Sequence, residues 1–101
     1  METGETFVAL VIYPSTKAGQ DDQAETLVRM AASIRRMPGF VGGRVFLSED
    51  GESVISLVEW QDRESFAAFR RSEFGRAATQ VAGELHPKAY WLRPHASIDA
   101  P

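Results

Sequence analysis

The stretch GFVGGRVFLSEDGESVISLVEWQDRESFAAF, residues 39–69, decides the fold of this chain. An apolar run at 45–47 is followed by Asp50-Gly51, and a second apolar run occupies 54–58. Asp-Gly between two such runs is a strong hairpin signal, because both central residues of a tight two-residue turn need positive φ. The stretch therefore predicts two antiparallel strands joined by a tight turn.

A helix is expected directly after the hairpin. Asp62 opens this helix, and Phe66 and Phe69 follow at a spacing that places both on one side of it. Trp60 therefore lies where the second strand meets the helix. We expect a ligand at this junction.

The rest of the chain completes an α+β domain. A β-branched and aromatic run at 7–13 predicts a strand, and 21–36, with acidic and basic ends around an apolar stripe, predicts a helix. A break at 72–75, a short helical piece at 77–82 and a last strand at 89–92 follow. The order β-α-β-β-α-β is that of ferredoxin-like folds, with an antiparallel four-stranded sheet and the helices on one face.

Size and composition set further limits. The 101 residues indicate a single domain, with a core at about 6–93 and a tail at 94–101 that is loose or lies on a partner. The absence of cysteine rules out disulfides and thiolate metal sites and fits a cytoplasmic protein. A net charge of −3 with scattered arginines argues against nucleic acid, and no apolar run is long enough to span a membrane. The polar, acidic segment 1–6 is not expected to be a signal peptide.

Two of the expected strands are apolar on both faces, although the helices cover only one face of the sheet. In 7–13 and 54–58, apolar residues occupy both alternating sets of positions. Leaving several such side chains in water would forgo about 1.5–3 kcal/mol each, and a contiguous apolar face usually marks an association surface. We therefore predict a homodimer in which two sheets pack face to face.

Four segments resemble one protein family. They are PGFVGGRVF at 38–46, SLVEW at 56–60, RESFAAF at 63–69 and PKAYWL at 87–92. Together they are similar to the antibiotic biosynthesis monooxygenase family, over nearly the whole chain. The resemblance implies a dimeric α+β barrel with a small aromatic pocket between the sheet and the helices. It also implies that a small aromatic, polyketide-derived molecule reacts with dioxygen without metal, flavin or haem, because the substrate anion passes an electron to oxygen directly.

Trp60 and Ser56 are the first candidates for the site. Strand alternation places them on one face with Val54 and Val58, and the resemblance turns this face toward the helices. The Trp60 indole either forms a pocket wall and donates its N–H to a ligand, or fills the core. Ser56 falls where an anthrone-oxygenating member of the family carries an amide, and its hydroxyl either contacts a phenolate or is satisfied within the strand.

Phe66 and Phe69 either stack against a planar ligand or belong to an ordinary core. The same family member has a tyrosine at the position of Phe66, whose hydroxyl contributes to substrate binding or proton transfer. It also has an arginine near the end of this helical region, where the present chain offers Arg76 or Gln80. These differences leave open whether anthrone chemistry carries over.

His86, Tyr13 and Arg44 are the remaining polar candidates. His86, on the loop before the last strand, is the candidate general base near neutral pH, although a lone loop histidine often faces solvent. Tyr13 is a phenol donor at the end of its strand, and Arg44 pairs either with an anionic substrate oxygen or with Glu59 across the hairpin. The two isolated histidines, His86 and His95, do not make a metal site.

Three functions are compatible with these residues. The leading hypothesis is a cofactor-independent monooxygenase, with Trp60, Ser56 and His86 as catalytic candidates. The alternative is a non-catalytic dimeric ligand-binding or structural relative, which the changes at Ser56 and Phe66 favour. An isomerase or cyclase for a small quinone-like molecule is the third. Haem breakdown is disfavoured, because the strand at 7–13 lacks the asparagine that haem-degrading relatives use and 77–79 lacks their histidine.

Overall fold

The structure, a computed structural model, describes residues 6–101. Its elements are β1 (Phe7–Pro14), α1 (Gln20–Ile34), β2 (Phe40–Leu47), β3 (Ser53–Trp60), α2 (Arg63–Arg71), α3 (Glu73–Gly83) and β4 (Lys88–Leu92). The expected order is confirmed, with one refinement: the second helical region is two helices. Residues 1–5 lie outside the described part of the chain. The expectation that 1–6 is not a signal peptide therefore stays a prediction.

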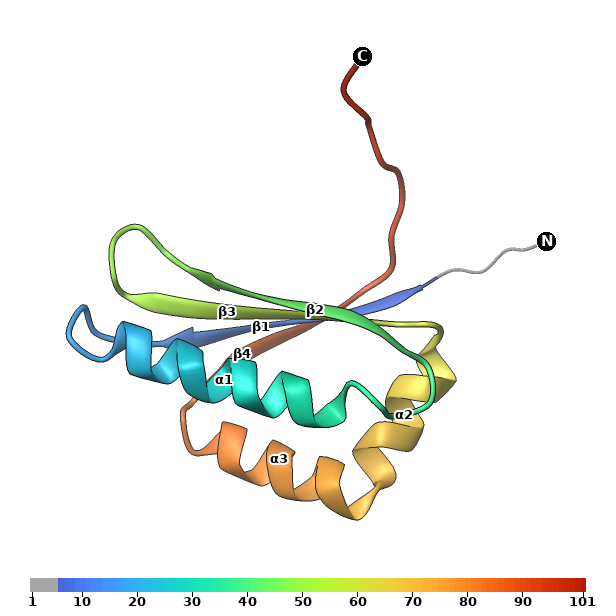
Figure 1. Cartoon of the computed structure of the whole chain (residues 1–101), viewed down its shortest axis with the longest axis horizontal. Helices are drawn as coiled ribbons and strands as arrows, with labels where there is room; N and C mark the ends of the chain where they lie inside the picture. The colour runs from blue at the N-terminus through green and yellow to red at the C-terminus, as the bar shows by residue number, and fades with distance from the viewer. Residues whose placement is uncertain (1–5) are drawn as a thin grey trace.

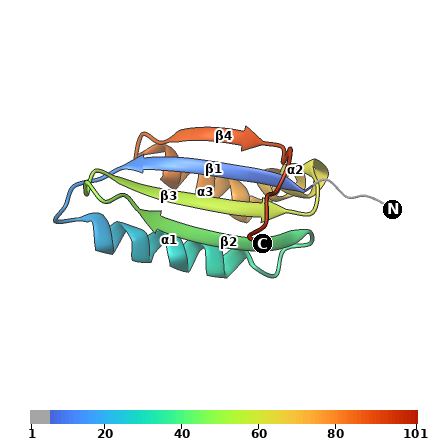
Figure 2. The ribbon, with the colours of Figure 1, turned by 90° about the horizontal axis from the view of Figure 1, so that it is seen from above.

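The four strands form one antiparallel sheet in the order β2-β3-β1-β4. All three helices lie on one side of this sheet (Figure 1). Figure 2 looks onto the opposite side, where no helix covers the strands. The ferredoxin-like α+β architecture is therefore confirmed, and none of the helices within 6–101 is long and apolar enough to cross a membrane.

The pairing of β1 with β3 sets which side chains face the helices. Phe7 lies opposite Trp60 and Tyr13 lies opposite Val54. Because strand side chains alternate, the set containing these residues and Ser56 faces the helices. The expected orientation of Trp60 and Ser56 is confirmed. The alternate set lies on the helix-free face.

The hairpin between β2 and β3 differs from the tight turn predicted at Asp50-Gly51, so that prediction is wrong. The strands end at Leu47 and begin again at Ser53, and only Gly51 in the loop has a positive φ, of 79°. The Asp50 carboxylate accepts hydrogen bonds from the Ser48 hydroxyl (2.7 Å) and the Glu52 N–H (2.9 Å). These side-chain bonds hold a longer loop, in which the Gly51 N–H donates to the Ser48 carbonyl.

Ser72 divides the second helical region. Its N–H donates to the carbonyls at the end of α2, and its hydroxyl oxygen accepts from the Gly75 N–H at the start of α3. One residue therefore caps both helices, and the break expected over 72–75 takes a single position. A side chain at Gly75 would collide with the Phe69 carbonyl, so only glycine permits this close turn.

The core consists of two clusters rather than one. One cluster is centred on the buried Trp60 and Phe66 with Ala9 and Ile34. The other, toward the opposite end of β1 and β3, consists of buried Tyr13, Ala24, Leu27 and Val54. The space between the helices and the middle of the sheet is left for a site.

Candidate functional site

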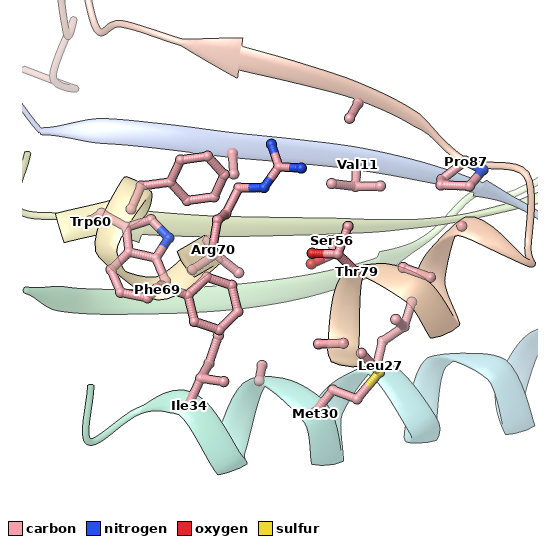
Figure 3. A pocket seen from close by; sticks show the side chains of 18 of the residues that line it. Val11, Leu27, Met30, Ile34, Ser56, Trp60, Phe69, Arg70, Thr79 and Pro87 are labelled. Carbon is pink, nitrogen blue, oxygen red and sulfur yellow. The ribbon is translucent and has the colours of Figure 1, made fainter. Parts of the chain in front are cut away.

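A cavity of about 280 Å³ lies between the sheet and the three helices (Figure 3). Its walls come from β1, β3 and β4 and from all three helices. Helix α3 packs against α2 and roofs the cavity. The volume is close to the lower end of the range for small-molecule pockets.

Five of the seven sequence candidates line this cavity. They are Trp60, Ser56, Tyr13, Phe66 and Phe69. They come from β1, β3 and α2, and Figure 3 shows Trp60 and Phe69 at one end with Ser56 near the middle. The junction between β3 and α2 is thus part of the cavity wall.

The end of the cavity next to this junction is aromatic. The rings of Trp60 and Phe69 stack, with centroids 5.2 Å apart and planes at 27°. Phe66 lies 6.2 Å from Trp60 and 5.0 Å from Trp91 of β4, between centroids. Offset and tilted rings at these separations attract one another, and they present flat apolar surfaces suited to a planar ligand.

Two buried hydrogen-bond donors face the cavity from its opposite ends. Trp60 is 1% exposed and Tyr13 is 5% exposed. Six residues of strand, about 20 Å, separate their positions along the β1–β3 pair. Within residues 6–101, neither the indole N–H nor the phenol hydroxyl donates to a protein acceptor. Buried donors are normally paired, so these two are available to a ligand.

The Tyr13 phenol remains neutral in this setting. Burial disfavours the phenolate and raises the pKa of Tyr13 above its ordinary value. The hydroxyl is therefore protonated at neutral pH and acts as a donor. Ser56, halfway along the cavity floor, adds another hydroxyl without a protein partner among the described residues.

Arg44 and His86 do not line the cavity. Arg44 lies on the helix-free face of β2, where its guanidinium carbon is 4.7 Å from the centre of the Phe46 ring. Within 6–101 it makes no ion pair with Glu59. His86 is exposed on the α3–β4 loop with a φ of 54°, and the neighbouring Pro87 contributes to the wall instead.

The remaining sequence candidates also lie elsewhere. Arg76 is exposed and donates to the Arg71 carbonyl (3.2 Å), while Gln80 and His95 are exposed and outside the cavity wall. Neither of the two positions that the resemblance offered for an arginine therefore lines the cavity.

Sequence reasoning missed four polar or aromatic wall residues. Arg70 projects from α2, Phe74 and Thr79 from α3, and Trp91 from β4. Arg70 follows Phe66 by four residues, a spacing that places both on one helix face. Trp91 lies opposite Ala9 of β1, but the choice between Tyr90 and Trp91 as the inward residue requires the register of β4.

The chemistry of the wall is that of binding and orientation. No aspartate, glutamate or histidine lines the cavity among the described residues. Over the same part of the chain, no three His, Cys, Asp or Glu side chains are grouped so as to hold a metal ion. The wall can hold a flat ring, donate hydrogen bonds to its oxygens and keep water away from it.

Comparisons with known proteins agree with this fold. Tetracenomycin-F1 monooxygenase of Streptomyces glaucescens is 31% identical over 65 residues, which are 63% of this chain and 58% of that protein's length, less than two thirds. A monooxygenase from the gene ActVA-Orf6 of Streptomyces coelicolor, solved in complex with nanaomycin D, is 25% identical with a TM-score of 0.73, covering 96% of this chain and 94% of its own.

A second solved structure shares the fold. SnoaB, a cofactor-independent oxygenase from Streptomyces nogalater, has a TM-score of 0.72 at 18% identity, over 98% of this chain and 99% of its own. The family model described as antibiotic biosynthesis monooxygenase matches residues 7–81, most of the domain. The chain belongs to the antibiotic biosynthesis monooxygenase family.

Proposed function

We propose that the protein is a monooxygenase that brings a small planar aromatic substrate, of polyketide type, into reaction with dioxygen without a cofactor. The observation that carries this proposal is the pair of buried donors, Trp60 and Tyr13, that face the cavity without a protein acceptor. The stacked rings of Trp60 and Phe69 suit the flat substrate, and the donors suit its oxygens. The similarity to monooxygenases with this fold supports the same reaction class.

The reaction needs little from the protein beyond binding. The substrate carries a methylene group flanked by aryl rings and conjugated to a carbonyl, and it binds as the anion that it forms in solution by losing a proton. This anion passes one electron to dioxygen. The radical pair combines to a peroxide, which loses water, so that one methylene and one dioxygen give one carbonyl and one water. Donors preorganised around the oxygen that carries the negative charge lower the barrier. We assign this role to Ser56 and Trp60, which both line the cavity, and the apolar walls would exclude water.

Oxygen uptake tests the proposal. The protein, in metal-free buffer with chelator, is given a panel of anthrones and hydroquinones. With the anthrones we expect consumption of one dioxygen per carbonyl formed. We expect a reduction of about tenfold or more in kcat/KM for Trp60→Phe, which loses a donor. Tyr90→Phe, on the helix-free face, is the matched aromatic control and should react as wild type. Equal rates in wild type, Trp60→Phe and buffer alone would exclude the proposal.

We also propose that the protein is a homodimer, and the helix-free sheet face supports this. It carries contiguous apolar side chains on all four strands: Val8, Leu10 and Ile12 of β1, Phe46 of β2, Ile55 and Leu57 of β3, and Tyr90 and Leu92 of β4. In the single chain the first six of these side chains are only partly buried, and Tyr90 and Leu92 are exposed. A second copy of the same face would cover them.

The C-terminal tail adds to the argument for a dimer. Residues 93–101 run away from the sheet on its helix-free side (Figure 1) and are exposed throughout. Ile98 is 97% exposed. A partner seated on the helix-free face would lie beside this segment and would offer Ile98 an apolar surface.

The second candidate function is a ligand-binding protein without turnover. The absence of a carboxylate or imidazole from the described cavity wall favours it, as does a phenylalanine rather than a hydroxyl-bearing ring at Phe66. The same assay separates the two functions. A carrier would bind anthrones, as measured by calorimetry, and leave the oxygen uptake at the buffer rate.

A further inference from the structure

We propose that Arg70 selects aromatic ligands that carry a negatively charged oxygen, by binding this group at the aromatic end of the cavity. The inference rests on the proposed use of the cavity as a ligand site and goes beyond it, because it assigns the charge of the ligand and the residue that reads it. Arg70 is the only cationic side chain in the described cavity wall.

The position of Arg70 is set by two rings from different elements. Its guanidinium carbon lies 5.8 Å from the ring centre of Phe66 on α2 and 5.5 Å from that of Trp91 on β4. Cations are attracted to aromatic faces at such distances. Figure 3 shows the guanidinium on the cavity side of α2, in the space between Trp60 and Val11 in that view. The charge is thus held against the rings at the cavity rather than directed away from it.

Within residues 6–101, Arg70 has no anionic partner. It forms no ion pair and donates no hydrogen bond to a protein acceptor. The adjacent Arg71, in contrast, pairs with Glu64 at 3.1 Å. A guanidinium has five N–H donors in a planar fork that matches a carboxylate. Among residues 6–101, the N–H donors of Arg70 therefore have no protein acceptor and can bind a ligand.

The surroundings define where the anion would sit. Trp60, Phe69 and Phe66 supply flat surfaces at the same end of the cavity, and the wall contains no carboxylate in the described residues to repel an anion. A fused ring stacked there would place a ring substituent next to the guanidinium. The ligand group that Arg70 would bind is an anionic oxygen on an aromatic ring, either in a carboxylate or in an ionised phenol.

Calorimetry with a matched pair of ligands tests the inference. The probes are 2-naphthoate and its neutral isostere 2-naphthamide, with 2-naphthol titrated at pH 7 and at pH 10 to test an ionised phenol. We expect wild type to bind naphthoate about tenfold more tightly than the amide at low salt, as charge-assisted hydrogen bonds allow. High salt should reduce this preference.

Three variants test whether Arg70 causes the preference for 2-naphthoate over 2-naphthamide. Arg70→Gln should abolish it while leaving the amide affinity within about twofold of wild type, and Arg70→Lys should retain part of it, because the charge remains but the fork is lost. Arg71→Gln, which removes a neighbouring positive charge outside the cavity wall, should keep the full preference. Thermal unfolding checks that each variant is folded.

Two results would overturn the inference, and they are distinguishable. If wild type binds both naphthalene ligands equally and Arg70→Gln changes neither affinity, Arg70 does not select for charge, while the proposed function stands. If wild type binds none of the probes, the cavity does not take aromatic ligands and the proposed function falls as well.

Discussion

At the scale of single residues, two buried side chains of the cavity wall carry polar atoms that the fold does not need in order to be stable. Trp60 and Tyr13 are almost fully buried, yet their donors find no acceptor in the described chain. An unpaired buried donor costs about 1–3 kcal/mol, so a sequence selected for stability alone would carry phenylalanine at such a position. The indole N–H and the phenol hydroxyl are what we expect of a binding site in which a ligand supplies the missing acceptors.

Tyr13→Phe separates the packing of the Tyr13 ring in the core from the proposed hydrogen bond of its hydroxyl to a ligand. Removal of an unsatisfied hydroxyl should leave the free energy of unfolding at pH 7 unchanged or slightly raised, by up to about 1 kcal/mol. The affinity for an aromatic ligand with a suitably placed oxygen should fall about fivefold, the value of one hydrogen bond. Chemical denaturation and calorimetry measure the two quantities. A marked loss of stability with unchanged affinity would contradict the role as a ligand donor.

The same residue predicts a pH dependence at the alkaline end. Burial raises the pKa of Tyr13 in the folded state, so the folded protein favours the neutral phenol. The resulting stability is fully present below the ordinary tyrosine pKa of about 10. It is lost as the pH rises through the raised value. Unfolding curves from pH 8 to 11 should therefore fall more steeply for wild type than for Tyr13→Phe, and parallel curves would contradict this.

At the scale of elements, one contact fixes the junction that carries Trp60. Gly39, between α1 and β2, has a φ of +87°, and a Cβ built there would collide with the Ser65 side chain in the first turn of α2. The Gly39 carbonyl also accepts a hydrogen bond from the Gln61 N–H at 2.6 Å. The loop after α1 and the start of α2 thus hold the end of β3 between them.

Gly39→Ala should therefore destabilise the domain and disturb the cavity together. The left-handed backbone alone costs an alanine about 1–2 kcal/mol, and the collision with Ser65 adds to this. Gly42→Ala is the matched control, because a Cβ there meets nothing within 4 Å, and it should change stability by less than about 0.5 kcal/mol. Denaturant unfolding gives both values, and equal effects would refute the steric argument.

The start of α2 predicts an acid-sensitive contribution to stability. The Asp62 carboxylate accepts from the Ser65 N–H and hydroxyl, both at 2.8 Å, and the backbone bond is the larger cause of the lowered pKa of Asp62. The contribution is therefore present above the ordinary aspartate pKa and is lost as the pH falls through the lowered value.

Asp62→Ala and Asp62→Asn separate the cap from its charge. The alanine variant should melt a few degrees lower at pH 7, and the difference from wild type should shrink below pH 4. The asparagine variant still caps the helix but should not show this pH dependence. A constant difference between wild type and alanine down to pH 2 would contradict the assignment.

The elements also show what the sequence can and cannot predict. Apolar periodicity placed all four strands and α1, and alternation alone put Trp60 and Ser56 on the same face. The turn type at Asp50-Gly51 was not predictable, because the Ser48 and Asp50 side chains bond the backbone and lengthen the loop. Arg70 and Trp91 were missed because their places depend on how α2 and β4 meet in three dimensions.

At the scale of the whole molecule, one face of the sheet borders the cavity and the other is covered by no helix, so the proposed dimer is tested on the second face. Leu57→Glu places a charge at the centre of the apolar helix-free face, opposite Leu10 of β1. We expect wild type to sediment as a dimer at protein concentrations on the order of 10 µM, with a Tm that rises with concentration, and Leu57→Glu to sediment as a monomer.

A charge control and a contradicting result complete this experiment. Gln80→Glu adds the same charge at an exposed position of α3 and should leave the dimer intact. A wild type that remains monomeric at this concentration, with a Tm independent of concentration, would contradict the association of the two sheets.

The division of the core into two clusters has a consequence for how this fold diversifies. The buried groups around Trp60 and around Tyr13 stabilise the two ends of the β1–β3 pair, and the middle of the sheet needs no filling. Small residues there, such as Ala31 and Ala78, border the hollow. A larger residue in place of either alanine would narrow the chamber while both clusters stay intact, so such a scaffold can change the size of its hollow without rebuilding its framework.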